Sequence, residues 1–182
     1  VGQGDRRTRN LLAALGKGKS LPRRLIYVST TGVYGDCGGA AIDETRRLNP
    51  ESARAGRRVA AENSLRAWGR RTGVAVSILR APGIYAADRL PLERLQKGLP
   101  ALVDRDDVYT NHIHADDLAR ACVAALWRAR SQRVYNVNDD TRLRMGDYFD
   151  LAADLYGLPR PPRIARDVAQ TELPLGLLSF MR

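Results

Sequence analysis

The feature that most constrains the fold is a strand–helix–strand unit in the first half of the chain. Residues 24–29 form a near-continuous apolar run, which is typical of a parallel strand covered on both faces. A long helix is predicted next, with Asn49 as its N-cap, Pro50 at its first position and Gly73 as its stop. Residues 74–79 then form a second apolar run. Because crossover units of this kind join parallel strands, the sequence predicts an α/β fold.

Helices and strands alternate on both sides of this unit. The further predicted elements are a helix capped by Asp5 and ended by Gly16 and Gly18, a short helix over residues 90–99, a strand over 108–113, a helix over 115–130, a strand over 133–137 and a helix over 145–156. Three prolines, Pro159, Pro161 and Pro162, then interrupt the pattern and predict a linker. With 182 residues, of which 44% are apolar, the chain is long enough to bury a hydrophobic core.

The excess of basic residues is spread over the whole chain. Lysine and arginine number 30 against 20 aspartates and glutamates, a formal charge of +10, and only Lys17, Lys19 and Lys97 are lysines. The arginines lie in small groups, usually close to an acidic residue, which is typical of a solvated surface. Aromatic residues make up 6%, which leaves few stacking platforms for bases. We therefore expect no nucleic-acid partner; a steep fall of affinity with salt would indicate the opposite.

The cysteines and the apolar runs bear on the compartment. Cys37 and Cys122 are too few for a disulfide framework and lack metal-type spacing, so a cytoplasmic location is expected. No apolar run approaches the ~20 residues of a membrane-spanning helix, so no membrane contact is expected. The chain starts with Val1 rather than Met and ends in an apolar stretch, residues 173–181, that should need a packing partner. Both ends suggest a segment of a longer polypeptide.

Hydroxyl groups and a glycine follow the two strands of the crossover unit. Ser29, Thr30 and Thr31 lie where the first strand ends, and Pro82 and Gly83 follow the second. In open α/β sheets, ligands bind at the carboxyl ends of the strands, so these residues are candidates for a binding site. Hydroxyls and glycines also make ordinary turns, and this alternative stays open for each stretch taken alone.

Four stretches together resemble the extended short-chain dehydrogenase/reductases, the NAD-dependent epimerase/dehydratase family. They are residues 28–35 (Val-Ser-Thr-Thr-Gly-Val-Tyr-Gly), 79–85 (Leu-Arg-Ala-Pro-Gly-Ile-Tyr), 112–119 (His-Ile-His-Ala-Asp-Asp-Leu-Ala) and 135–137 (Tyr-Asn-Val). They occur in the family's order and cover about residues 5 to 160. The resemblance implies the C-terminal part of a doubly wound, Rossmann-type parallel sheet with a small substrate-binding region.

The resemblance also implies a domain organisation. Residues 1–160 are expected to form a partial NAD(P)-binding, Rossmann-like domain, interrupted by substrate-binding segments at about residues 86–112. Residues 161–182 are expected to be a proline-containing linker and a truncated C-terminal segment. The family's glycine-rich turn, which seats the cofactor pyrophosphate on a helix N-terminus, has no counterpart, because no strand precedes Gly2 and Gly4.

The family's tyrosine and lysine, four residues apart on one helix face, are missing as well. Alignment on the Ala-Glu pair at 61–62 places Arg54 at the tyrosine position and Arg58 at the lysine position. No tyrosine occurs between Tyr34 and Tyr85. Arginine, with a pKa above ~12, stays protonated and only donates hydrogen bonds, so Arg54 is a poor general acid or base. Arg58 can still bond a ribose hydroxyl or a phosphate, and a solvated helix face is the alternative for both arginines.

The resemblance assigns a role to each candidate site residue. Thr30 aligns with the hydroxyl that donates a hydrogen bond to the substrate oxygen, and it is predicted to be catalytic together with Arg54 and Arg58. The predicted cofactor-binding residues are Ser29, Arg58, Pro82, Gly83 and Ile84. The predicted substrate-binding residues are Thr31, Tyr34 and Tyr85, and packed aromatics are the alternative for the two tyrosines.

A metal site at the two histidines is an alternative that the resemblance does not support. His112 and His114 precede Asp116 and Asp117, and two imidazoles with a carboxylate can hold zinc or iron. The family pattern favours helix capping by Asp116 and a structural histidine. We therefore expect no bound metal.

These assignments predict an oxidoreductase of the epimerase/dehydratase type that uses NAD or NADP. Its expected substrate is a nucleotide sugar or a similar hydroxyl or carbonyl compound, and a homodimer is the assembly we consider. The missing tyrosine leaves a second hypothesis open, a catalytically impaired NAD(P)-binding sensor or regulatory protein.

Overall fold

The structure is a computed structural model and describes residues 4–173. The chain divides into two compact units, each built from two stretches of sequence. Unit 1 consists of Val1–Pro82 and Ile113–Asn138, and unit 2 of Gly83–His112 and Asp139–Arg182. The chain therefore leaves unit 1 after the second strand of the crossover unit and returns to it once.

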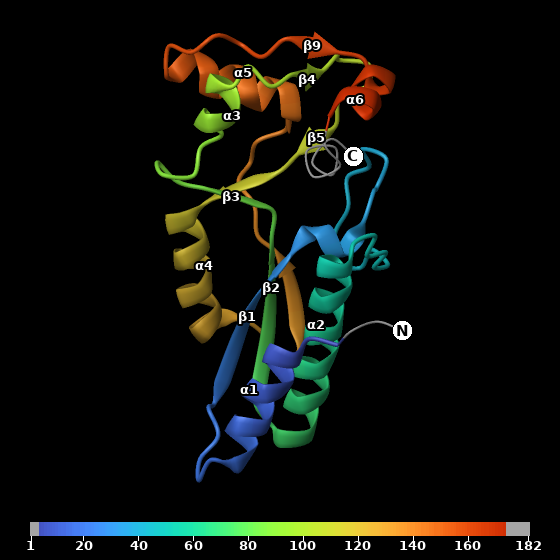
Figure 1. The fold of residues 1–182 in the computed structure, drawn as a ribbon. Coiled ribbons are helices and arrows are strands. Elements are labelled where there is room, and N and C mark those ends of the chain that lie inside the picture. The colour runs from blue at the N-terminus through green and yellow to red at the C-terminus, as the bar shows by residue number, and fades with distance from the viewer. Residues whose placement is uncertain (1–3, 174–182) are drawn as a thin grey trace. The chain divides into compact units, whose positions relative to one another are not determined.

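Unit 1 is a three-stranded parallel sheet with helices on both faces (Figure 1). Its elements are α1 (Arg6–Lys17), β1 (Arg24–Thr30), the short 3-10 helix η1 (Thr31–Tyr34), α2 (Ala53–Thr72), β2 (Ala75–Ala81), α4 (Ala115–Arg128) and β7 (Arg133–Asn136); β6 (His112–His114) leads into α4. The strand order is β1-β2-β7, and the register aligns Ser29 with Arg80 and Arg80 with Asn136. The predicted α/β class and its crossover unit are confirmed.

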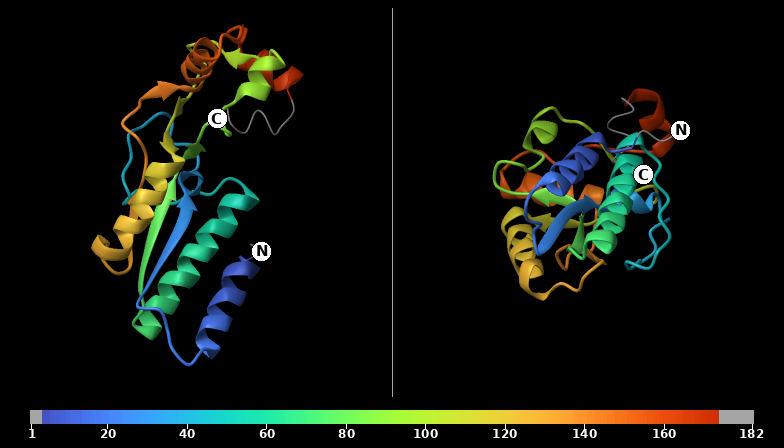
Figure 2. Two further views of the ribbon diagram at one scale, coloured as in Figure 1. Left: turned by 90° about the vertical axis from the view of Figure 1, so that its left-hand side faces the viewer. Right: turned by 90° about the horizontal axis from the view of Figure 1, so that it is seen from below.

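The alternation of side chains along β1 divides the core of unit 1 between the two faces of the sheet. Leu25 and Tyr27 pack with Leu65 and Trp68 on the face that α1 and α2 cover. Ile26 packs on the opposite face, which α4 covers. Figure 2 shows α1 and α2 side by side on one face and α4 on the other. Coverage of both faces explains why the strands read as continuous apolar runs.

The start of α2 differs from the prediction. Asn49 and Pro50, the predicted cap and first residue, lie before the helix, which begins at Ala53. Ser52 is the cap, because its Oγ accepts a 3.1 Å hydrogen bond from the Ala55 N–H. Asn49 instead donates its backbone N–H to the carbonyl of Val33 (3.1 Å), which ties it to the turn after β1. That long-range contact overrides the local capping signal.

Other predicted helix boundaries are confirmed. Asp5 caps α1 by accepting a hydrogen bond from the Arg7 N–H, and Gly73 ends α2 in the left-handed conformation, with φ of 77°. Gly16 does not end α1, which continues to Lys17. Between residues 4 and 173, no helix combines the length and apolar character that crossing a bilayer requires.

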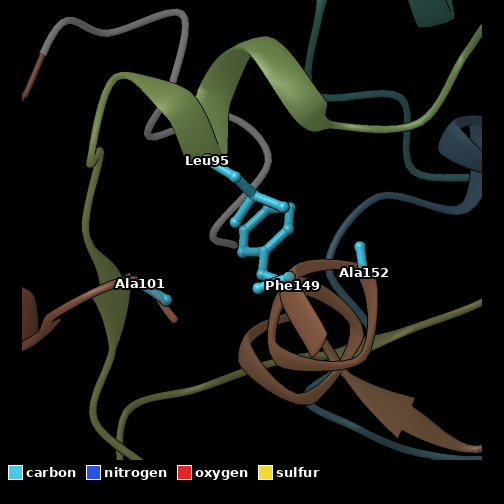
Figure 3. Packing of buried hydrophobic residues seen from close by; sticks show 5 residues of the cluster. Leu95, Ala101, Phe149 and Ala152 are labelled. Atoms are coloured by element: carbon cyan, nitrogen blue, oxygen red, sulfur yellow. The ribbon is translucent and has the colours of Figure 1, made fainter. Parts of the chain in front are cut away.

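Unit 2 is built from short strands and helices around a small apolar core. Its elements are β3 (Gly83–Tyr85), α3 (Leu92–Gln96), β4 (Ala101–Leu102), β5 (Tyr109–Thr110), β8 (Leu143–Arg144), α5 (Met145–Leu155), β9 (Arg163–Ile164) and α6 (Arg166–Glu172). Leu95 of α3 and Phe149 of α5 meet in the core, beside Ala101 and Ala152 (Figure 3). The predicted substrate-binding segment, 86–112, falls within this unit.

The stretch for which we predicted a linker, from residue 161 on, contains a strand and a helix. β9 pairs in parallel with β4, where Ala101 aligns with Arg163. Ala169 of α6 is fully buried and packs against Leu102. The prolines interrupt local periodicity, but the partners of this stretch lie about sixty residues earlier, out of reach of a local pattern. Of the predicted apolar end, residues 173–181, only Leu173 is described, and it packs against the cluster of Leu102 and Ala169.

Candidate functional site at the carboxyl end of the parallel sheet

Thr30 is the last residue of β1 and lies half-buried at the carboxyl edge of the sheet. Its Oγ1 accepts a hydrogen bond from the Gly32 N–H (3.2 Å) and caps η1. A threonine hydroxyl can accept two hydrogen bonds and donate one, so this contact leaves the O–H available as a donor. Thr30 therefore presents a donor at the edge where open α/β sheets bind ligands.

The turn after Thr30 is held by burial and by a tight backbone contact. Val33 and Tyr34 are 0% and 2% exposed. Gly35, the next residue, has φ of 71°, and a Cβ there would lie 2.2 Å from the carbonyl oxygen of Asn49. Only glycine fits this position, so a larger residue at 35 would force the turn away from Asn49.

A buried ion pair lies behind the turn. Glu62 of α2 and Arg80 of β2 are 2% and 3% exposed and make two hydrogen bonds, from Arg80 Nη2 to Glu62 Oε2 (2.6 Å) and from Arg80 Nε to Glu62 Oε1 (3.1 Å). Ser29 Oγ also donates to Glu62 Oε1, at 2.5 Å. Burial disfavours the charged guanidinium, but the bonds to Glu62 and Tyr34 and the charge of Glu62 raise the pKa of Arg80 above its ordinary value. The Arg80 guanidinium therefore keeps its charge in this buried position.

Tyr34 connects this ion pair to the third strand. Arg80 Nη1 donates to the Tyr34 hydroxyl (2.8 Å), and that hydroxyl donates to Asn136 Oδ1 (2.8 Å). The Arg80 guanidinium also lies 4.8 Å from the centre of the Tyr34 ring. The backbone N–H of Asn136 donates to Glu44 Oε1 (2.7 Å), in the long loop after η1. Tyr34, predicted to bind substrate, thus has its hydroxyl bonded on both sides inside unit 1.

The two arginines predicted to stand at the family's tyrosine and lysine positions have different surroundings. Arg54 is exposed in the first turn of α2, and none of residues 4–173 pairs with its guanidinium. Arg58, one turn later, is half-buried and donates from Nη1 to the hydroxyl of Tyr27 on β1 (2.8 Å). Arg58 is therefore partly committed to the sheet, whereas Arg54 is open to a ligand.

Three predicted site residues, Gly83, Ile84 and Tyr85, form β3 in unit 2. A Cβ on Gly83 would lie 2.8 Å from Cδ2 of His112, so this glycine allows a close approach. The Tyr85 ring meets the His112 ring edge-on, with centroids 6.3 Å apart, and His112 stacks on Tyr148 at 4.1 Å. The other predicted residues, Ser29, Thr30, Thr31, Tyr34, Arg54, Arg58 and Pro82, lie in unit 1.

The histidines have the surroundings of structural residues. Burial lowers the pKa of His112 and outweighs the opposing effect of the Asp139 charge. His114, not Asp116, is the N-cap of α4, because its Nδ1 accepts a hydrogen bond from the Asp116 N–H (3.2 Å). Within the described part of the chain, no cluster of three or more His, Cys, Asp or Glu side chains is arranged to hold a metal.

Local motifs did not identify the buried partners of the site. We used Glu62 only to align α2, and Arg80 and Asn136 only as parts of strands. A signal was present, because a charged residue in a strand that is buried on both faces must be paired. The matching charge, Glu62, lies 18 residues earlier in the sequence.

Comparisons with known proteins agree with this architecture. Residues 6–138 match the model of the NAD dependent epimerase/dehydratase family. A conserved protein of unknown function from Silicibacter pomeroyi has a solved structure with a TM-score of 0.80 and 32% identity, covering 99% of this chain and 62% of that chain. A dTDP-glucose 4,6-dehydratase from Streptomyces venezuelae, solved with NAD, has a TM-score of 0.72 and 24% identity, covering 87% and 52%.

A curated relative shows the same relationship in sequence. It is a trifunctional enzyme from Arabidopsis thaliana, a UDP-glucose 4,6-dehydratase, UDP-4-keto-6-deoxy-D-glucose 3,5-epimerase and UDP-4-keto-L-rhamnose reductase, 26% identical over 147 residues. The match covers 75% of this chain and 22% of that enzyme, so the chain spans only part of the relative's length. Because the family model covers well over half of the 182 residues, the chain belongs to the NAD dependent epimerase/dehydratase family, as the four motifs predicted.

Proposed function

We propose that the protein containing this chain is an oxidoreductase that uses NAD or NADP to act on a nucleotide sugar or a similar hydroxyl or carbonyl compound. The observation that carries the proposal is the Thr30 hydroxyl, which lies at the carboxyl edge of the sheet with its O–H available as a donor. Membership of the family supports the reaction class. The bacterial dehydratase with the same fold was solved with NAD bound.

The side chains of unit 1 fit part of such a cofactor. Arg58 has five N–H donors and uses one of them on Tyr27, so others can reach ribose hydroxyls or a phosphate. Ser29 is 5% exposed and bonded to Glu62, so we assign it the support of Thr30 rather than direct contact with the cofactor. When bound, the nicotinamide would supply the acceptor or donor of hydride.

Thr30 would donate its hydrogen bond to the substrate oxygen and stabilise negative charge that develops there. Arg54 would add a positive charge from the first turn of α2. Neither Arg54 nor Arg58 can take up a proton, because arginine stays protonated. The chain therefore needs a different proton acceptor from the one that the family uses on this helix.

The absence of a tyrosine from α2 favours a second candidate, a catalytically impaired protein that binds NAD(P) and regulates a partner. By the alignment on the Ala-Glu pair, exposed Arg54 would take the place of the phenol, and α2 carries no tyrosine. In this case the cofactor binds, but no substrate is oxidised. The two candidates share the binding step and differ in turnover.

Titration calorimetry of the natural polypeptide with NAD and NADP tests the shared step, and the absence of binding would defeat both candidates. Hydride transfer, followed at the nicotinamide absorbance with a panel of nucleotide sugars, separates them. Thr30→Ala should reduce turnover by about a hundredfold, as loss of one positioned donor does, whereas Thr30→Ser keeps the hydroxyl and most of the activity. Activity that survives Thr30→Ala would remove the role assigned to Thr30.

A further inference from the structure

We propose that the buried Glu62–Arg80 ion pair positions Thr30 for its ligand, so that both charged residues are positioning residues of the site. That Thr30 meets a ligand rests on the proposed function. The positioning itself rests on hydrogen bonds inside unit 1, which can be measured without any ligand.

The residue before Thr30 is fixed to one end of the pair. Ser29 lies on the face of β1 that α2 covers, and its hydroxyl donates to Glu62 Oε1 at 2.5 Å. Ser29 is 5% exposed, so water cannot readily replace Glu62 as its partner. The end of β1 is therefore anchored on α2 at Ser29.

The turn that follows Thr30 is fixed to the other end. Tyr34 ends η1, is 2% exposed, and receives a 2.8 Å hydrogen bond from Arg80 Nη1. Because Arg80 can only donate, the Tyr34 hydroxyl must give its own proton elsewhere, and Asn136 Oδ1 accepts it at 2.8 Å. Thr30 is thus bracketed by two anchors, one residue before it and four residues after it.

Arginine is the residue that can hold both anchors at once. Its planar fork places two donors on Glu62 and a third on Tyr34, while the guanidinium also lies over the Tyr34 ring. A lysine at position 80 would be a point charge for Glu62, without the fork that also reaches Tyr34. Stability alone does not call for such a device, because well-packed apolar residues often replace a buried ion pair without loss. Apolar residues could not hold the hydroxyls of Ser29 and Tyr34.

The main test is Tyr34→Phe in the natural polypeptide, which removes the hydroxyl and leaves the ion pair intact. Its matched control is Tyr135→Phe, which removes a hydroxyl of β7 that accepts from the Arg130 N–H (2.9 Å). The readouts are the Thr30 methyl resonance and the exchange rate of the Gly32 amide, whose N–H is bonded to Thr30 Oγ1. Tyr34→Phe should shift the Thr30 resonance. It should also speed exchange of the Gly32 amide by about tenfold, because a tenfold change corresponds to the loss of one to two net hydrogen bonds. Tyr135→Phe should leave both unchanged.

A second variant and ligand affinity complete the test. Arg80→Lys keeps a charge beside Glu62 and should reproduce the Thr30 and Gly32 changes, and the double variant with Tyr34→Phe should add little to them. Ligand affinity should fall by at least about tenfold in the same variants. Unchanged Thr30 and Gly32 signals in Tyr34→Phe would overturn the positioning role. Changed signals in a protein that binds neither cofactor nor nucleotide sugar would instead overturn the proposed function.

Discussion

Each unit contains an ion pair next to its core, and the two pairs differ in burial. In unit 1 the side chains of Arg80 and Glu62 are 3% and 2% exposed, and neutral hydroxyls surround the pair. In unit 2 the side chains of Arg163 and Asp150 are 25% and 22% exposed, and a second arginine, Arg160, lies 4.0 Å from the same carboxylate. Water can reach Arg163 when its partner is lost, but it cannot readily reach Arg80. The difference teaches that an ion pair fixes geometry when it is fully buried and contributes less when water reaches it.

The largest expected effect is that of Glu62→Gln, which leaves the Arg80 charge buried without its counter-ion. Loss of one partner of a buried pair costs about 3–5 kcal/mol of unfolding free energy. Urea unfolding followed by tryptophan fluorescence measures the loss, because unfolding exposes Trp68, which is 3% exposed in the core of unit 1. The control replaces Glu62 and Arg80 together by methionine and should lose much less. Equal losses of unfolding free energy in the two variants would show that the unpaired Arg80 charge is not the cause of the lost stability.

The corresponding change in unit 2 is Asp150→Asn. Its partner Arg163 is partly solvated and keeps a contact to the carbonyl of Leu102, so the loss should be about 1 kcal/mol or less. Hydrogen exchange of the Ala101 and Val103 amides, which are bonded across to the β9 strand region, reports on this unit. A loss as large as that of Glu62→Gln would break the contrast between the units.

A smaller effect in unit 2 depends on pH. Burial lowers the pKa of His112 below its ordinary value of 6.5 in the folded protein, so below pH 6.5 the unfolded chain binds the proton more readily. The stability of unit 2 is therefore complete above pH 6.5 and falls as the pH drops toward the folded-state pKa, by at most about 1.4 kcal/mol per pH unit. Exchange of the Val103 amide at about pH 7.5 and pH 6 measures the change. His112→Phe keeps a ring against Tyr148 and should remove the pH dependence, and its persistence in that variant would assign it to another group.

The smallest effect is expected at a fully exposed pair. Lys97 and Glu93 form an i,i+4 contact of 2.6 Å on α3, with side chains 62% and 82% exposed. Lys97→Gln should leave the unfolding midpoint of unit 2 unchanged, because solvent already screens both charges. A measurable shift of the midpoint would show that exposed ion pairs, as well as the partly buried one, stabilise unit 2.

The sequence predicted the elements whose signals are local, and missed those that depend on distant partners. The strands β1 and β2 follow from apolar runs, and the role proposed for Thr30 follows from a motif that ends a strand. Ser52 took the capping position from Asn49 because Asn49 is held by Val33, across the turn. No local pattern links Arg80 with Tyr34, which is 46 residues away in the chain. Such partners become visible only when the register of the sheet is known.

One edge of the sheet has a consequence for the site. Among the described strands β1 pairs only with β2, so the N–H and C=O groups on its other side form an open template for a further strand. A strand that joined there in parallel would lie about one strand spacing, ~4.8 Å, from β1 and would point its carboxyl end toward the same edge of the sheet as Thr30. Arg80 lies on β2, on the other side of β1 from this open edge. A further strand would therefore bring new side chains to one side of Thr30, while Arg80 lies on the other side.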